Sequence, residues 1–379
     1  MIETDPKTPG QLLRDLLRER GWTQEVLAIV LGVSKSSISM VLAGTRPVTA
    51  EFALGLEEVF DVPAERFLEL QKRSDLARAQ LEARPDPGRR MRARLYGDLP
   101  IAEMRRRGWL ALDDVRDVRA TEAALMRFFD ARSVEEIEVL PHAAKKTQVT
   151  GPVSPAQLAW IYRVRSIASE MLVRRYSDGM VRGAIDKLAA LRSDPELARH
   201  VPRIMAEAGI RFVIVESLPS AKIDGVCFWI NESSPVVGMS LRFDRIDNFW
   251  FVLRHELEHV ARGHGRDAIM LDAELEGERA GVGDSVSEEE RLANEAAADF
   301  CVPRIAFERF VARKSPFFAE RDVLGFARTL NVHPGLVAGQ IQRITGRYER
   351  FRNHLVKIRA CVAPGAMVDG WGDVAPVDG

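Results

Sequence analysis

Two histidines four residues apart, His255 and His259, carry the strongest chemical signal in the chain, in the segment His-Glu-Leu-Glu-His. On a helix this spacing places both imidazoles on one face, where they can bind the same metal ion. Glu256 lies beside the pair and can take a proton from a metal-bound water, because zinc lowers the pKa of that water to about 7. The pattern predicts a Zn²⁺ site with Glu256 as general base in the hydrolysis of peptide bonds.

A catalytic zinc needs a third protein ligand and keeps one position open. The metzincin pattern would continue with a glycine and a third histidine at positions where this chain has Arg262 and Gly265. Gluzincin-type sites take a glutamate from a later helix, with Asp or Asn four residues further on to support a zinc histidine. Two adjacent candidates have this spacing, Glu290 with Asn294 and Glu295 with Asp299. The two glutamates lie about 140° apart around a helix, so both cannot face the metal equally well.

The later segment is Glu290-Arg-Leu-Ala-Asn-Glu-Ala-Ala-Ala-Asp-Phe-Cys-Val-Pro303. Together with His255–His259 it resembles the ImmA/IrrE metallopeptidase family, whose pattern is H-E-x-x-H, then E-x-x-A-N-x-x-A, an apolar run and proline. The resemblance covers roughly residues 205–345. It implies one Zn²⁺ per chain with Glu290 as third ligand and Glu295 as the alternative.

The first 70 residues contain five short amphipathic helical patterns separated by residues typical of helix ends. Gly32 is placed to form the turn between the second and third patterns. Ala28 permits close helix crossing, while Val33, Ile38 and Val41 are expected in a small core. A compact all-α domain is therefore predicted here.

Residues 24–43 resemble the helix-turn-helix of phage-repressor-like regulators, the XRE class. In such motifs the second helix enters the major groove of double-stranded DNA. The expected contacts are Lys35, Ser36, Ser37 and Ser39 on bases or phosphates, and Thr23, Gln24 and Arg46 on the DNA backbone. Residues 11–70 carry six Lys/Arg and nine Asp/Glu, a net charge of -3. A single copy should therefore bind DNA weakly, which favours a homodimer.

The chain is predicted to be multidomain. The helix-turn-helix domain takes residues 1–72, a helical connector 73–200, and an α+β gluzincin-like metallopeptidase domain 201–345, before a partly disordered C-terminal tail at 346–379. A hinge is expected at residues 83–88, which contain two prolines and a glycine.

Three strands are expected before the zinc helix, at 211–215, 225–230 and 236–241, and the helix itself at 248–262. We expect an extended substrate to lie along the last of these strands. Residues 272–290 contain eight carboxylates and favour a mobile acidic lid that attracts a basic or neutral substrate. The arginine-rich stretch 84–107 is a candidate internal inhibitor of the cleft.

The N-terminus lacks the pattern of a signal peptide, and no apolar run approaches the roughly 20 residues that span a bilayer. A cytoplasmic protein without a membrane partner is expected. Three scattered cysteines, Cys227, Cys301 and Cys361, favour reduced thiols rather than disulfides or a thiolate zinc site.

These patterns lead to one main hypothesis, a DNA-binding transcriptional regulator with a zinc-dependent endopeptidase domain. The resemblance to the ImmA/IrrE family implies that its substrate is a repressor protein, or the chain itself, in a stress or mobile-element response. An alternative is an antitoxin-like DNA-binding repressor whose metal-bound domain is a non-catalytic sensor. A third is a peptidase whose N-terminal domain binds only protein.

Overall fold

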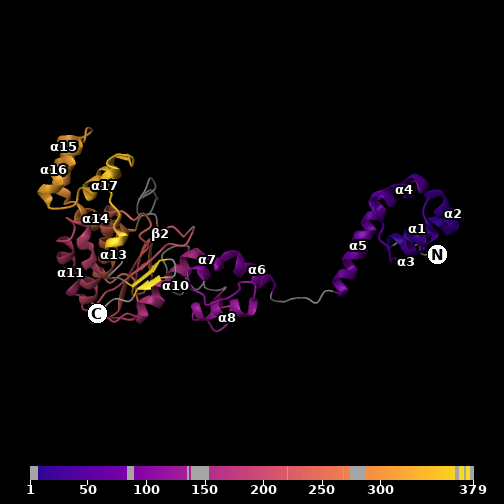
Figure 1. The fold of residues 1–379 in the computed structure, drawn as a ribbon, viewed down its shortest axis with the longest axis horizontal. Helices are drawn as coiled ribbons and strands as arrows, with labels where there is room; N and C mark the ends of the chain where they lie inside the picture. Colours follow the sequence, from indigo (N-terminus) through magenta and orange to yellow (C-terminus); the bar gives the residue numbers. More distant parts are fainter. Residues whose placement is uncertain are drawn as a thin grey trace. The chain divides into compact units, whose positions relative to one another are not determined.

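The computed structural model describes residues 7–82, 89–134, 136–137, 153–219, 221–267, 269–273, 287–362, 367–370 and 373–375. The chain divides into two compact units, Met1–Arg89 and Arg90–Gly379 (Figure 1). The predicted hinge at 83–88 lies outside the described residues, as does most of the predicted acidic lid.

Unit 1, Met1–Arg89, is all-helical. Its helices are α1 (Pro9–Glu19), α2 (Gln24–Leu31), α3 (Lys35–Ala43), α4 (Ala50–Phe60) and α5 (Ala64–Glu82). The first four begin where a hydroxyl side chain accepts a hydrogen bond from a free backbone N–H of the first turn, at Thr8, Thr23, Ser34 and Thr49. Gly32 ends α2 with a φ of 68°, a left-handed conformation that glycine adopts without strain. The last helix, α5, runs past the predicted domain boundary at residue 72.

The core of unit 1 fills the space between these helices. Leu13, Leu27, Ile38, Leu56 and Phe67 are completely buried in it. Among the described residues, no single helix is both long and apolar enough to cross a membrane. Helices α2 and α3 meet that requirement only as a pair, and the pair is bent by 117°.

Unit 2, Arg90–Gly379, is built on a mixed sheet with the strand order β4-β2-β3-β1-β5-β6. The strands are β1 (Arg211–Val215), β2 (Ile223–Trp229), β3 (Pro235–Met239), β4 (Met270–Ala273), β5 (Met367–Gly370) and β6 (Asp373–Ala375). Strand β1 is parallel to β3 and β5, whereas β2 is antiparallel to both β3 and β4. The C-terminal segment, where it is described, thus extends the sheet.

Helices cover both faces of this sheet (Figure 1). Successive side chains of β1 point to opposite faces and pack in two separate cores. Val213 and Val215 pack with α6 (Arg89–Asp98), α7 (Ile101–Arg106), α8 (Val118–Phe128) and α10 (Pro155–Glu170). Phe212 and Ile214 belong to the other core. That core contains residues of α11 (Met180–Ala189), η1 (Pro195–His200), α12 (Val201–Glu207), α13 (Ile246–Arg262), α14 (Glu288–Cys301), α15 (Arg304–Lys314), α16 (Glu320–Leu330), α17 (Pro334–Thr345) and α18 (Arg359–Val362). The segment assigned by sequence to a connector therefore belongs largely to unit 2: α6, α7, α8 and α10 pack in one core, and α11 and η1 in the other.

The predicted position of the substrate strand is wrong. Strand β3, which overlaps the predicted segment 236–241, is hydrogen-bonded to β2 on one side and to β1 on the other. It has no free edge that could pair with an extended peptide. The edges of the sheet are β4 and β6.

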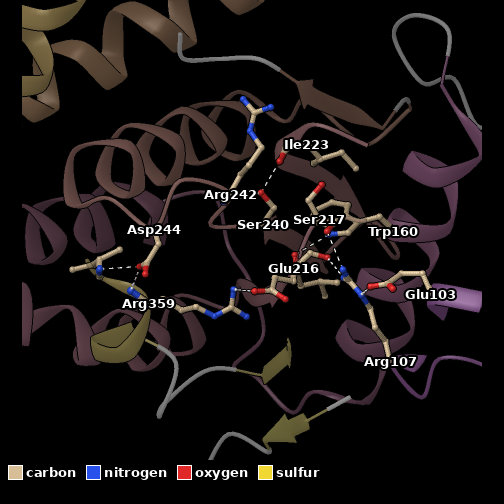
Figure 2. Close-up of polar contacts among 12 residues, drawn as sticks. Glu103, Arg107, Trp160, Glu216, Ser217, Ile223, Ser240, Arg242, Asp244 and Arg359 are labelled. Atoms are coloured by element: carbon tan, nitrogen blue, oxygen red, sulfur yellow. Dashed lines mark hydrogen bonds and ion pairs between the residues drawn. The ribbon is translucent and has the colours of Figure 1, made fainter. Parts of the chain in front are cut away.

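A polar network at the end of β1 holds helices from distant parts of the chain against the sheet (Figure 2). Arg107, which is almost completely buried, donates hydrogen bonds to the backbone oxygens of Glu216, at 2.7 Å, and Ser217, at 3.1 Å. Arg359 donates to the Glu216 carboxylate at 2.9 Å, and Trp160 Nε1 donates to a β1 carbonyl at 2.8 Å. Because Arg107 is used in this way, it cannot act as an inhibitory side chain in a cleft.

The start of α13 is held by the segment around Arg359, which also takes part in this network. Asp244, just before the helix, accepts hydrogen bonds from the backbone N–H groups of Ile358 and Arg359 at 3.0 and 2.7 Å (Figure 2). The backbone N–H of Ile246 donates to Val356 O at 3.0 Å. These contacts fix the first turn of the helix that carries the two histidines.

Candidate metal centre and nucleic-acid interface

Helix α13 presents His255 and His259 in the interior of unit 2. Both side chains are completely buried, and the apolar run before them in the same helix, Phe249–Leu253, is buried in the core of unit 2. The helix ends at Gly263, whose backbone N–H bonds to the carbonyls of the last turn. Sequence reasoning predicted this helix, its end and the shared face of the two histidines correctly.

The structure brings two carboxylates from other elements to the histidine pair. The Nε2 atoms of His255 and His259 lie 3.0 Å apart. Glu290, on α14, has one carboxylate oxygen 3.3 Å from His255 Nε2 and the other 3.5 Å from His259 Nε2. Asp272, on β4, has Oδ2 3.3 and 4.0 Å from the same two nitrogens. One potential ligand atom from each residue lies within 4.8 Å of the other three.

This donor set fits a zinc ion. Around a tetrahedral Zn²⁺ with bonds of about 2.0–2.2 Å, ligand atoms are separated by about 3.3–3.6 Å, close to the separations found here. Two imidazole nitrogens and two carboxylate oxygens are also ligands of the type that zinc takes. Buried groups of this kind need a partner, and a cation would supply one. The site is therefore a candidate metal centre.

The electrostatics of the cluster show how strongly its members depend on one another. Burial lowers the pKa of His255, but Asp272 and Glu290 outweigh that effect and raise it to about 9. Burial lowers the pKa of His259 to about 4. Burial also favours the neutral form of Asp272, yet the neighbouring His255 lowers the pKa of this carboxyl to about 2. Burial, opposed by His255, raises the pKa of Glu290.

Glu256 lies beside the cluster but outside the four-residue ligand set. It is completely buried, and neither of its carboxyl oxygens receives a hydrogen bond from the described residues. Burial and the negative charge of Asp272 raise its pKa well above the usual value. A carboxyl held beside the metal position but outside the ligand set is placed where a general base would act.

Gly225 on β2 makes room for this glutamate. A Cβ at position 225 would lie 2.0 Å from Glu256 Oε1 and 2.8 Å from its Cδ. Gly225 was the first residue of the predicted strand and lies inside β2 in the structure, where a glycine often marks close approach by another group. Asp272 had no comparable signal, because it appeared only as one of eight carboxylates in an acidic stretch.

The remaining predicted residues of this site take different places. Glu295 is exposed and forms an ion pair with Arg291 at 2.6 Å, so the structure does not bring it to the histidines. Asn294 is half-buried on α14, and its Oδ1 lacks a hydrogen-bond partner among the described residues. Asp299 is exposed and accepts a hydrogen bond from the backbone N–H of Arg304 at 2.8 Å, which places it at the start of α15 rather than beside the metal ligands.

His264 packs against the far side of the pair. Its Nδ1 lies 3.0 Å from Nδ1 of His259. It can therefore orient the ring of His259 while leaving Nε2 of that histidine directed at the cluster, as a supporting group does for a metal ligand.

The second candidate site is the surface of α2 and α3 in unit 1. The side chains of Lys35, Ser36 and Ser39 are exposed on α3, and those of Thr23, Gln24 and Arg46 are exposed beside it. Ser37 is half-buried and accepts a hydrogen bond from Arg46 Nη1 at 2.8 Å. Lys35 forms an exposed ion pair with Glu25 at 3.1 Å. All seven predicted contact residues thus lie on or next to these two helices.

A hollow of about 610 Å³ opens beside these residues. It is lined by Arg14, Leu17, Arg18, Trp22, Thr23, Gln24, Glu25, Lys35 and Leu42. Arg14 and Arg18, which sequence reasoning did not select, add positive charge next to Lys35. Their signal was the spacing of four residues, which places both on one face of α1.

Residues 13–67 match the helix-turn-helix family, which confirms the predicted domain. Over a part of its length, the chain is similar to putative HTH-type transcriptional regulatory proteins of three organisms. Identity is 38% over 78 residues for Haloquadratum walsbyi (21% of this chain, 24% of the relative), and 46% over 52 residues for Pyrococcus abyssi (14% and 16%). It is 36% over 74 residues for Thermococcus kodakarensis (20% and 21%). The match thus spans about a quarter or less of each relative.

One solved structure, a hypothetical protein from E. coli, is 30% identical over 26% of this chain and 96% of that chain, with a TM-score of 0.20.

Proposed function

We propose that this protein is a cytoplasmic, DNA-binding transcriptional regulator that carries a zinc-dependent endopeptidase centre of the ImmA/IrrE type. One observation carries the enzymatic part: His255, His259 and Glu290 converge at ligand distances, with Glu256 buried beside them and outside the ligand set. The DNA-binding part is supported by the match of residues 13–67 to helix-turn-helix domains and by the exposed polar face of α3.

In the DNA complex, α3 enters the major groove with its N-terminal turn toward the bases. Ser34 caps that turn, and its Oγ lies 2.9 and 2.8 Å from the hydroxyls of Ser36 and Ser37, so these side chains are ordered before DNA arrives. The hollow beside α3 brings Arg14, Arg18 and Lys35 together as candidate phosphate contacts. A homodimer would double these contacts and offset the negative charge of the domain.

At the metal centre, His255, His259 and Glu290 would hold the ion, and a zinc bound there would supply an activated water. Glu256, which lies outside the ligand set, would accept a proton from the attacking water at a carboxylate oxygen and return it to the leaving amine. Gly225 keeps this carboxyl in place, and His264 orients His259. The scissile bond would lie in an extended segment of a repressor protein or of the chain itself.

The proposal is tested by metal analysis and cleavage on the full-length protein. We expect about one zinc per chain, lost in His255→Ala and retained in Glu256→Gln. Glu256→Gln should abolish cleavage of a co-encoded repressor or of the chain itself. Glu295→Gln is the matched control, since it removes an exposed carboxylate from the same helix as Glu290 and should change neither property. If His255→Ala keeps its zinc, the proposed centre is wrong.

A second function, a non-catalytic metal-bound sensor, is favoured by Asp272. With this residue as a fourth protein ligand, the metal would have no open position, as in structural zinc sites. The sensor hypothesis requires that zinc be present and that Glu256→Gln have no effect on any cleavage or on transcription in the cell.

A further inference from the structure

Asp272 occupies a position in the cluster that catalysis would need free. Its Oδ2 lies 3.3 Å from His255 Nε2, and the side chain is 6% exposed. A tetrahedral zinc held by the two histidines and Glu290 has one remaining position, and a hydrolytic enzyme fills that position with water. A carboxylate at the same place excludes the water.

The strand that carries Asp272 also occupies the place of a substrate strand. Strand β2 pairs with β3 on one side and with β4 on the other, and β4 is an edge strand of the sheet. An extended peptide that binds next to the metal would pair with β2 along this same edge. In the β2–β4 register, Asp272 lies opposite Gly225, the residue against which Glu256 packs. One short strand thus covers both the water position and the peptide position.

The attachment of β4 is limited. Where the structure describes it, the strand spans four residues, Met270–Ala273, and its pairing with β2 is interrupted by an irregularity between Ile223 and Gly225. Short edge strands with few hydrogen bonds are among the parts of a protein that open most readily. Release of β4 would free the edge of β2 and the fourth metal position in one step.

We propose that β4 is an internal pseudosubstrate, in which Asp272 is the fourth metal ligand and keeps the centre closed until another extended segment displaces the strand. This inference rests on the proposed function, because it requires that the cluster hold a metal. The metal centre of the resting chain is inactive. A protein segment that pairs with β2 in place of β4 makes the fourth metal position accessible. A general base beside the metal and a fourth protein ligand on it can then both belong to one site, because Asp272 occupies the water position only in the resting chain.

The test uses full-length protein loaded with Co²⁺ in place of zinc, whose visible absorption reports coordination. With Asp272 bound, the wild-type spectrum should be unchanged between pH 6 and 9 and unchanged by acetohydroxamate. In Asp272→Asn and Asp272→Ala a water should enter, so the spectrum should titrate with a pKa near about 7. Acetohydroxamate should bind these variants at least about tenfold more tightly than wild type, a difference of about 1.4 kcal/mol. Glu295→Gln should behave as wild type.

A backbone variant separates the strand from its carboxylate. Leu271→Pro keeps Asp272 but removes a backbone donor and disfavours strand pairing, so it should open the centre as Asp272→Ala does. If Leu271→Pro retains the closed spectrum, the pseudosubstrate part of the proposal is wrong. If wild type already titrates and binds acetohydroxamate like Asp272→Asn, Asp272 is not a ligand, and the metal centre stands without this regulation. Retention of the Co²⁺ spectrum in His255→Ala would instead overturn the metal centre and the inference together.

Discussion

The helix-turn-helix surface and the metal centre position their functional groups in different ways. The first uses mostly exposed side chains, the majority of them from one continuous stretch, residues 23–46, whose geometry follows from two capped helices and a glycine turn. The second uses buried side chains from α13 and β4 and a half-buried one from α14. A local motif carries its own geometry, whereas a buried centre depends on the tertiary structure that brings its members together.

The two sites also differ in what stabilises them. The groups of the helix-turn-helix surface are solvated or bonded to one another without a ligand. Those of the metal centre are removed from water, and their charges are compensated only within the cluster. The stability of unit 2 should therefore depend on the metal, and that of unit 1 should not. The following predictions test this contrast, from the largest expected effect to the smallest.

The largest effect is expected from loss of a histidine ligand. His259→Ala should weaken zinc binding by more than the roughly 100-fold that loss of a supporting residue can cause. Calorimetric titration with zinc measures this change. DNA affinity, measured by fluorescence anisotropy on the promoter of its own gene, should stay within about twofold. A parallel loss of DNA binding would show that the two sites are not independent.

Removal of the metal should destabilise only one unit. A ligand present at 1,000 times its Kd stabilises the folded state by about 4 kcal/mol, so a strong chelator should lower the melting temperature of unit 2. Differential scanning calorimetry should then show one transition that moves and one that does not. If both transitions shift together, the claim that only unit 2 depends on the metal is wrong.

Gly225→Ala tests the packing around Glu256 without altering a ligand. The added Cβ would lie 2.0 Å from Glu256 Oε1, and such overpacking costs about 1–3 kcal/mol. We expect lower stability of unit 2 and loss of cleavage, with zinc retained. Gly183→Ala is the control, since its Cβ would meet nothing within 4 Å on helix α11 and should stabilise that helix by up to about 1 kcal/mol. If the two variants have the same stability and the same cleavage activity, Gly225 is not needed to make room for Glu256.

The sequence was sufficient for the parts that depend on short-range patterns. The helices of unit 1, the zinc helix and the choice of Glu290 follow from periodicity, helix caps and family resemblance. The strand order does not, because pairing of β4 and β5 with strands far away in sequence leaves no local trace. Asp272 was missed for the same reason: its distance from His255 is set by the β2–β4 register, and no spacing along the chain encodes it.

A smaller effect is expected at the DNA-binding surface. Arg46 is exposed and bonded to Ser37, so Arg46→Ala should leave the fold intact. It should weaken binding to all DNA sequences alike and reduce the slope of log affinity against log salt by about one. Titrations at several salt concentrations on specific and random duplexes check this. A loss confined to the specific duplex would assign Arg46 to base recognition.

The smallest effect, and one of opposite sign, is expected for Glu25→Gln. Glu25 and Lys35 form an ion pair whose side chains are 67% and 63% exposed, and pairs of this kind contribute about 0–1 kcal/mol to stability. The fold should therefore not change. Loss of the carboxylate removes negative charge from the hollow beside α3 and releases Lys35 for a phosphate, so DNA binding should become tighter and its salt dependence steeper by at most about one unit. At the buried centre, loss of a carboxylate removes a metal ligand; on this exposed surface it should improve the function. Weaker binding of Glu25→Gln would instead show that Glu25 positions Lys35 for the DNA.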